Sequence, residues 1–243
     1  MPRPRIEPEI STEPETSQRM IAAAVEAFGE RGYHATTTRD IAARAGLSPA
    51  ALYVHYPSKA ALLALISRQG HASALDLVTR AAAPGQDAAA ALARVVTEFA
   101  SWHARHHRVA RVVQYEFGAL PEADRAEIVG MRRRIEQVVE DLIRGGIAEG
   151  TMDVAHPRRV ARAILSLCVD VSRWYDPGGR DGPDDLGALY SELALRMVGT
   201  LPGHPRPAAP GGRIAGCCST SPTRSGPPCP STQETPRSPS PPP

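Results

Sequence analysis

The sequence is poor in aromatic residues, in lysine and in cysteine. Only 5% of its 243 residues are aromatic, whereas 42% are hydrophobic, and Lys59 is the one lysine. A β-sandwich draws on aromatic and β-branched residues, so this composition favours packed helices instead. The chain is long enough to bury a sizeable core, and we expect that core to be all-α.

Long apolar runs are absent as well. No segment approaches the roughly 20 apolar residues that a membrane-spanning helix needs. The first residues, MPRPRIEPEISTEPET, lack the apolar stretch of a secretory signal. Cys168 lies in an apolar helical pattern, and Cys217, Cys218 and Cys229 have the spacing of neither a zinc site nor a disulfide framework. These absences predict a cytoplasmic protein with reduced thiols and no membrane partner.

Motifs of catalysis are missing too. The sequence contains no nucleophile elbow, zinc-protease motif, phosphate-binding loop or dinucleotide fingerprint. Neither an enzyme nor a cofactor is therefore expected. The net charge is only +2, so any surface that binds nucleic acid must be local.

The two ends of the chain differ from its middle. Residues 1–15 are polar and rich in proline, and residues 202–243 hold 13 of the 24 prolines. Such segments bury too little apolar surface to offset their ordering entropy, which predicts a disordered arm over 1–15 and a disordered tail over 201–243. Between them the apolar period is helical. The expected helices cover about 17–31, 38–45, 49–56, 59–82, 88–106, 108–118, 121–149, 157–175 and 184–199.

The second and third expected helices form a candidate helix-turn-helix. Thr37 or Thr38 caps the first of them, Gly46 ends it, and Ser48 caps the next helix, with a proline at its first turn. Two short helices around a turn with glycine describe this motif, whose second helix enters the major groove of DNA.

The residues around that helix suit phosphate contacts. Tyr53, His55 and Lys59 can donate to phosphate oxygens along the groove, and residues 31–59 hold four basic side chains against one acidic side chain. For single residues an alternative stays open, since Tyr53 also suits the domain core and Lys59 also suits a solvated helix start.

The segment ATTTRDIAARAGLSPAALYVHYPSKAALL, residues 35–63, resembles the DNA-binding signature of TetR-family repressors, and the similarity extends upstream through IAAAVEAFGERGY. The resemblance implies a helix-turn-helix domain over 16–60 and a helical ligand-binding and dimerisation domain over 61–200. It implies a homodimer that binds double-stranded operator DNA and responds to a small hydrophobic effector. Val54 departs from the larger or polar residue that is frequent at its position. The implied phosphate contacts are Thr37, Ser48, Tyr53, His55 and Lys59, and the implied base-facing residues are Arg39, Pro49, Ala50 and Ala51.

The last two expected helices carry apolar stripes spaced by three and four residues. Such stripes serve either an internal core or a four-helix seam with a second copy. The family resemblance assigns the dimer interface to these helices. The predicted interface residues are Ile164, Leu167, Val171, Trp174, Leu186, Tyr190 and Leu193.

The middle helices are expected to enclose the effector cavity. The segments WHARHHRVARVVQYEFGALPEADRAEIVGMRRRIE and SRWYDPGG loosely resemble a branch of regulators that sense acyl-coenzyme A thioesters. Arg132, Arg133 and Arg134 either meet a coenzyme A phosphate or form a solvated face, and the second interpretation is preferred. The predicted lining residues are Phe99, Trp102, Val113, Phe117 and Ile135.

Three alternatives stay open at this point. His103 and His107 lie four residues apart on one helix, a spacing that can hold a metal, so the regulator could respond to a metal, although too few other ligands lie near and no metal site is assigned. The small base-facing residues also allow a ligand-binding protein with degenerate DNA recognition. A partner-binding role for the tail is the third.

Overall fold

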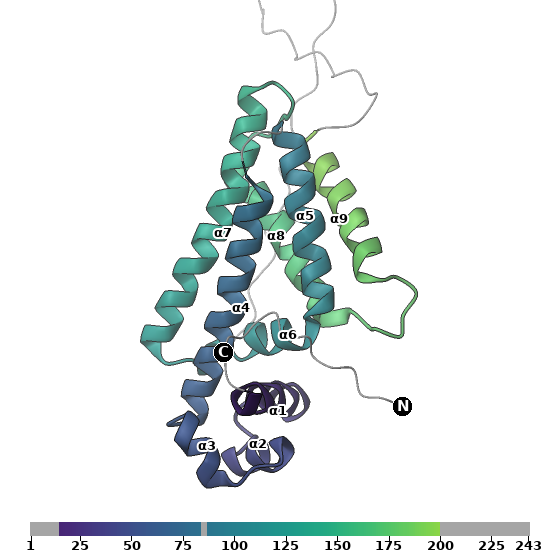
Figure 1. Ribbon diagram of the computed structural model, residues 1–243. Coiled ribbons are helices and arrows are strands. Elements are labelled where there is room, and N and C mark those ends of the chain that lie inside the picture. Colours follow the sequence, from purple (N-terminus) through teal and green to yellow (C-terminus); the bar gives the residue numbers. More distant parts are fainter. Residues whose placement is uncertain (1–14, 84–86, 200–243) are drawn as a thin grey trace, which may run out of the picture. The chain divides into compact units, whose positions relative to one another are not determined.

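The computed structural model describes residues 15–83 and 87–199, and no strand occurs among them. The predicted all-α class is confirmed (Figure 1). No helix within these two ranges is long and apolar enough to cross a membrane. Except for Glu15, the predicted arm and tail lie outside the described residues. The helices are α1 (Glu15–Arg31), α2 (Thr38–Ala45), α3 (Pro49–His55), α4 (Lys59–Ala81), α5 (Ala88–Arg105), α6 (His107–Tyr115), the 3-10 turn η1 (Phe117–Ala119), α7 (Glu122–Ala148), α8 (Pro157–Trp174) and α9 (Pro183–Met197).

Side-chain caps fix the short helices α2 and α3. Of the two candidate caps for α2 it is Thr37 whose Oγ1 accepts from the Asp40 N–H at 3.2 Å, while the Asp40 carboxylate accepts from the Thr37 N–H at 2.8 Å. Gly46 ends the helix with φ of 69°, in the left-handed region that favours glycine. Ser48 Oγ then accepts from the Ala51 N–H at 3.2 Å. These local bonds and the turn at Gly46 fix where α2 begins and ends and where α3 begins.

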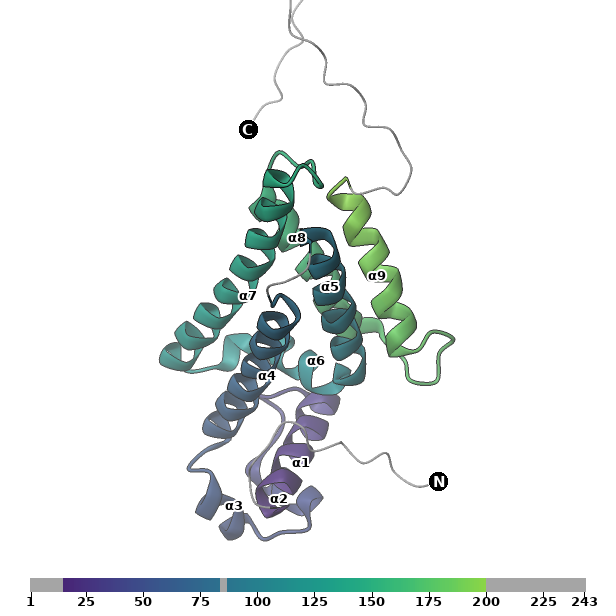
Figure 2. The ribbon, with the colours of Figure 1, turned by 45° about the horizontal axis from the view of Figure 1, so that its top comes forward.

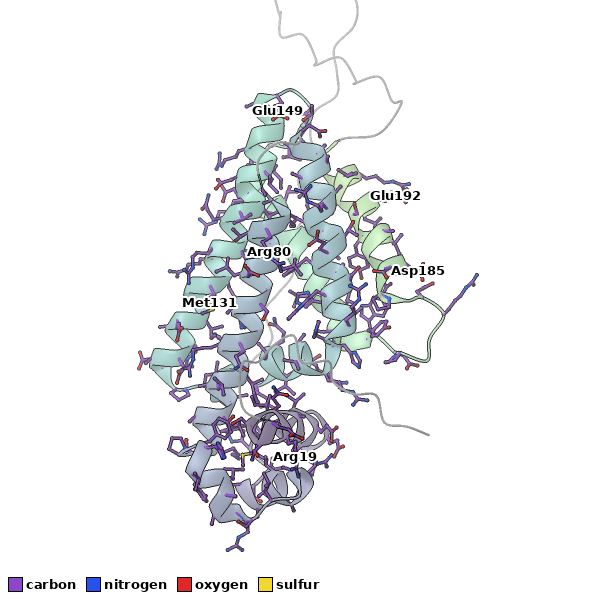
Figure 3. All side chains as sticks on the ribbon, in the orientation of Figure 1. Arg19, Arg80, Met131, Glu149, Asp185 and Glu192 are labelled. Atoms are coloured by element: carbon purple, nitrogen blue, oxygen red, sulfur yellow. The ribbon has the colours of Figure 1, made fainter. Side chains whose placement is uncertain are left out.

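Helix α4 passes through two apolar clusters. The first cluster joins the side chains of α1, α2 and α3 to Leu62 and Ile66 of α4, and it also includes Val112 of α6 and Ile128 of α7. Met131 of α7, labelled in Figure 3, packs against the same cluster. The apolar core under the helix-turn-helix therefore continues into helices that follow residue 100, and the domain boundary near residue 60 stays a prediction.

The second cluster holds α5, α7, α8 and α9 around the remainder of α4. Helix α9 lies along α5 (Figure 2), and Gly187 permits this close approach. A Cβ atom at Gly187 would meet Ser101 Oγ at 2.2 Å and the Thr97 carbonyl oxygen at 2.6 Å. Ser101 Oγ also donates to the Pro183 carbonyl at 2.9 Å. These contacts fix which face of α9 remains available to another molecule.

Candidate DNA-binding surface and effector cavity

Helix α3 presents most of its side chains to solvent. Leu52 is fully buried and anchors the helix, whereas Tyr53 is 54% exposed and Val54 is 81% exposed. A short amphipathic helix with exposed rings and hydroxyls is suited to enter a DNA groove. Among the predicted DNA contacts, Thr37, Arg39, Ser48, Pro49, Ala50, Tyr53 and His55 are exposed, and Ala51 and Lys59 are partly buried.

Two of the predicted phosphate ligands are oriented by protein partners. The Tyr53 hydroxyl lies 3.1 Å from Thr38 Oγ1, and His55 Nδ1 lies 3.4 Å from Ser17 Oγ. A phenol hydroxyl both donates and accepts, so the Tyr53 oxygen retains capacity for a phosphate. The rings are thus held in place and still accessible.

Lys59 has a structural role that the sequence did not indicate. Its Nζ donates to the carbonyl oxygens of Tyr33 at 2.6 Å and Thr36 at 2.7 Å, and it lies 4.2 Å from the centre of the Tyr33 ring. The ammonium group thereby joins the start of α4 to the connection between α1 and α2. Since an ammonium has three donors, one of them remains for the predicted phosphate contact.

The positive charge of the helix-turn-helix is smaller than a count of residues implies. Arg44 pairs with Glu30 at 2.5 Å, and Arg31 pairs with Asp40 at 3.5 Å. The hydrogen bond from Arg44 holds the pKa of Glu30 below its usual value. Arg39 is exposed and forms no ion pair with any residue that the structure describes. Arg39 is therefore the cation most available to DNA.

A second arginine connects α1 to the end of α2. Arg19, labelled in Figure 3, donates to the carbonyl of Ala45, just before the turn at Gly46. This bond satisfies a carbonyl at the C-terminus of α2, where a positive charge is favourable. Arg19 thus supports the turn rather than the DNA-facing surface.

A cavity of about 410 Å³ lies between α4, α5, α6, α7 and α8. Its volume lies in the range of small-molecule sites. Four of the predicted lining residues, Phe99, Trp102, Val113 and Ile135, are part of its wall. Phe117 is not; its ring instead lies 4.3 Å below the Arg132 guanidinium. The cavity wall is largely apolar on the side of α5 and α6.

Three polar side chains on α4, α6 and α7 also line the cavity and are joined by hydrogen bonds. Arg132 Nε donates to His71 Nε2 at 3.0 Å, and an Nη of Arg132 donates to Gln114 Oε1 at 3.1 Å. His71 Nδ1 bonds the Ser67 carbonyl at 2.8 Å. Burial lowers the pKa of His71 to about 4, so this histidine is neutral at physiological pH. Burial also lowers the pKa of Arg132, but a guanidinium remains charged.

The mouth of the cavity carries paired charges. Glu136 accepts from Arg158 at 2.9 Å and from Arg162 at 3.1 Å, and Asp170 pairs with Arg173 at 2.7 Å. Burial raises the pKa of Glu136, but the bonds from the two arginines outweigh it and the pKa is lowered. Arg162, Asp170 and Arg173 line the cavity and are also exposed, so they lie where it meets solvent.

The histidines of α5 and α6 are held by backbone carbonyls. His103 Nδ1 bonds the Phe99 carbonyl at 2.8 Å, and His107 Nδ1 bonds the Ala104 carbonyl at 2.9 Å. Burial lowers the pKa of His103 to about 4. Within residues 15–83 and 87–199 no three histidine, cysteine, aspartate or glutamate side chains gather as metal ligands. Nothing in this part of the chain supports the metal-responsive alternative.

Helix α6 separates the cavity from the helix-turn-helix. Val113 lines the cavity, and a methyl of Val112 is 3.8 Å from the Cβ position of Gly29 on α1. Directly after the helix, Glu116 Oε1 accepts from the Tyr33 N–H at 3.0 Å. A displacement of α6 therefore acts on α1 through an apolar contact and on the connection between α1 and α2 through a hydrogen bond.

The predicted dimer residues fall into two groups. Leu167 is 44% exposed and Trp174 is 45% exposed, and Leu193 is exposed as well. Tyr190 is partly buried. Leu189, which the sequence did not indicate, adds another exposed side chain on α9. The three residues of the stripe that face the chain's own core are Ile164, Val171 and Leu186.

Four candidate residues were missed from the sequence. His71 and Gln114 become partners of Arg132 only through tertiary contact, across 61 and 18 residues. Glu116 reaches Tyr33 across 83 residues. No local pattern marks such pairs. Leu189 could have been predicted from the sequence, because it lies one turn before Leu193 on the same helix.

Comparison with known proteins accounts for this arrangement. Residues 20–66 match the bacterial regulatory proteins of the tetR family, and residues 85–198 match the tetracyclin-repressor-like C-terminal domain. Over 187 residues the chain is 32% identical to the HTH-type transcriptional repressor KstR2 of Mycolicibacterium smegmatis, a match that covers 72% of this chain and 87% of that protein. The chain belongs to the TetR family.

Two other regulatory proteins extend the comparison. A regulatory protein of the tetR family from Rhodococcus RHA1 has a TM-score of 0.73 at 41% identity, covering 76% of this chain and 98% of that one. The fatty acid metabolism regulator protein of Bacillus subtilis is 24% identical over 182 residues, covering 74% of this chain and 92% of that protein. The comparisons do not assign single residues, so the contacts given above for DNA, effector and dimer stay predictions.

Proposed function

We propose that this TetR-family repressor binds its operator as a homodimer and leaves it when a hydrophobic effector, an acyl-coenzyme A thioester, occupies the cavity. The observation that carries the proposal is the position of α6. One face of this helix lines the cavity and the other packs on α1. An occupant of the cavity is thus connected to the DNA-facing helices through α6 and α1.

The acyl group is the part of the effector that suits the enclosed space. The walls contributed by Phe99, Trp102 and Val113 are apolar, and burial of alkyl groups there is favourable by roughly 0.8 kcal/mol per CH2. The charged mouth around Arg162 and Arg173 suits the polar part of a thioester that extends outward. The relative named for fatty acid metabolism supports a lipid-derived effector.

Release from DNA follows from differential binding. A dimer binds two half-sites only when its two recognition helices lie about 34–36 Å apart, or a multiple of that distance. The effector shifts the equilibrium toward another spacing only as far as it binds that state more tightly. The coupling is reciprocal, so operator DNA must also weaken effector binding.

The test is a fluorescence-anisotropy titration of full-length protein with the DNA upstream of its own gene, at several salt concentrations. We expect salt-dependent binding that dodecanoyl-coenzyme A weakens at least tenfold, with coenzyme A alone as the control. The same thioester should raise the melting temperature, since it binds the native state. Trp102→Ala should reduce both responses and leave effector-free DNA binding nearly unchanged.

Two outcomes would contradict the proposal. Protein without salt-dependent DNA binding would favour a binding protein with degenerate DNA recognition. A melting temperature that rises with zinc and falls back with EDTA, with no response to thioesters, would favour a metal-responsive regulator.

A further inference from the structure

Arg132 is a partly buried cation whose protein partners are all neutral. Its Nε donates to His71 Nε2, so this nitrogen carries no proton, and the His71 proton lies on Nδ1 toward the Ser67 carbonyl. The second partner is the amide oxygen of Gln114. The third contact is the face of the Phe117 ring, which attracts a cation but carries no charge.

Every other charged side chain that lines the cavity has a partner of opposite charge. Glu136 is shared by Arg158 and Arg162, and Asp170 pairs with Arg173. No carboxylate pairs with Arg132 among the described residues. Arg133 and Arg134 are exposed and do not line the cavity. Arg132 is thus the one charged lining residue without a partner of opposite charge among the described residues.

We propose that Arg132 binds a carboxylate carried by the apolar, enclosed part of the effector. This inference rests on the proposed function, because it names a group on the effector of that same cavity. Buried charges in proteins are ordinarily paired. The two carboxylates that line the cavity, Glu136 and Asp170, already form ion pairs with other arginines. A ligand carboxylate supplies the missing partner.

The geometry suits a carboxylate better than a neutral oxygen. The two bonds to His71 and Gln114 and the Phe117 ring hold the guanidinium plane in one orientation. Nη1 has no hydrogen-bond partner within residues 15–83 and 87–199. A planar guanidinium held in this way offers parallel N–H groups to a carboxylate. The apolar surroundings strengthen that pair relative to the same pair in water.

The carboxylate has two sources, and they are chemically distinct. A free fatty acid brings the group at the end of its chain. An acyl-coenzyme A thioester brings it only when the acyl chain carries a second, free carboxyl group. The two sources are separable with four probes of equal chain length: dodecanoate, dodecan-1-ol, dodecanoyl-coenzyme A and the mono-coenzyme A thioester of dodecanedioic acid.

The experiment measures the affinity of full-length protein for each probe by calorimetry at pH 8, below the concentration at which these amphiphiles aggregate. We expect the probe with a free carboxylate to bind about tenfold or more tightly than its neutral counterpart in at least one pair. A preference within the acid and alcohol pair identifies a free acid. A preference within the thioester pair identifies the acyl chain with a second carboxylate.

Arg132→Met tests the assignment, and Arg133→Met is the matched control. Both variants remove one positive charge from the same helix, but only the first removes a cavity residue. Arg132→Met should abolish the preference for the carboxylate, with the alcohol binding as before, and Arg133→Met should retain it. Arg132→Lys keeps the charge without the planar fork, so it should retain part of the preference.

The results separate this inference from the proposed function. Equal affinity of wild-type protein for the members of both pairs, including no binding of either member, would overturn the carboxylate site, and this comparison needs no variant to fold. A preference that survives Arg132→Met would also overturn it. If dodecanoyl-coenzyme A still releases the operator in either case, the proposed function stands. Carboxylate binding at Arg132 without any effect on DNA would instead overturn the proposed function alone.

Discussion

The helix-turn-helix and the cavity differ in which of their arginines form ion pairs. Around α2 and α3, Arg44 and Arg31 pair with carboxylates, and Arg39 is left in water. In the cavity it is the partly buried Arg132 that lacks a carboxylate. A cation in water keeps its hydration until it contacts a phosphate. A cation in an apolar wall has lost part of its hydration, and neutral partners offset that loss less than an anion does. The first arrangement suits reversible contact with DNA, and the second suits a cavity that is complete only with its ligand.

The largest expected effect tests whether both regions depend on a dimer. Leu167→Glu places a charge on the exposed face of α8, where the single chain tolerates it. In a dimer seam the same charge is buried without a partner, at a cost of several kcal/mol. We expect sedimentation to show a monomer whose operator affinity is lower by about a hundredfold or more, which is about 2.7 kcal/mol.

The control for this variant is Ile147→Glu. Ile147 is also an exposed apolar residue, and it lies near the end of α7. This variant should remain dimeric and bind the operator normally. A dimer formed by Leu167→Glu, with its DNA affinity intact, would place the interface elsewhere on the molecule.

The second prediction compares two arginines of the helix-turn-helix. Arg39→Ala removes a cation without an ion pair among the described residues, and we expect operator affinity to fall by about 1–3 kcal/mol with relaxed base preference. Arg44→Ala removes a cation already bound to Glu30, so its DNA affinity should change little and its stability should fall only slightly. Anisotropy on operator and scrambled DNA distinguishes the two variants. The reverse order of effects would show that α2 meets DNA by another face.

The sequence sufficed for features that depend on neighbouring residues. The cap at Ser48, the turn at Gly46 and the start of α5 after Asp87 each involve residues within three or four positions. Such signals are contained in a single helix and its caps, and tertiary contacts do not alter them. The sequence left Tyr53 open between the surface and the core, and the structure shows that it is exposed.

The sequence did not suffice for features that depend on packing between several helices. The stripe on α8 was correct as a helical period, but Leu167 and Trp174 lie about 60° around the helix from Ile164 and Val171. Only the packing of α8 against other helices determines that Ile164 and Val171 are the pair that faces the core. Phe117 was predicted to line the cavity, and its ring instead supports Arg132. The phase of an apolar stripe and the partner of a charge are tertiary properties.

The third prediction concerns the neutral histidines of the cavity. His103 has a folded pKa of about 4, below its ordinary value of 6.5. The unfolded chain therefore takes up the proton first as the pH falls, and stability is lost between pH 6.5 and pH 4. At pH 5 the loss from this group is about 2 kcal/mol relative to pH 8. His71 should contribute a similar loss, because its folded pKa is also about 4.

Urea unfolding at pH 8 and pH 5 measures this loss. His103→Asn keeps a donor for the Phe99 carbonyl and removes the titration, so it should reduce the pH dependence by about 2 kcal/mol. His156→Asn is the control, since His156 is exposed before α8. An unchanged pH dependence in His103→Asn would mean that the ring is not buried as a neutral group.

The smallest expected effect tests the connection between the two regions. Glu116→Ala removes the bond to the Tyr33 N–H, and Glu116→Gln keeps an acceptor at the same position. Both variants retain the apolar contact of α6 with α1, so we expect operator affinity without effector to change little in either. The factor by which saturating dodecanoyl-coenzyme A weakens operator binding should fall about fivefold in Glu116→Ala, which is about 1 kcal/mol of coupling, and less in Glu116→Gln. Glu127→Ala, an exposed carboxylate on α7, should leave that factor unchanged. Full coupling in Glu116→Ala would show that the packing of Val112 on α1 transmits the signal without the hydrogen bond, and the connection between cavity and DNA would then be apolar throughout.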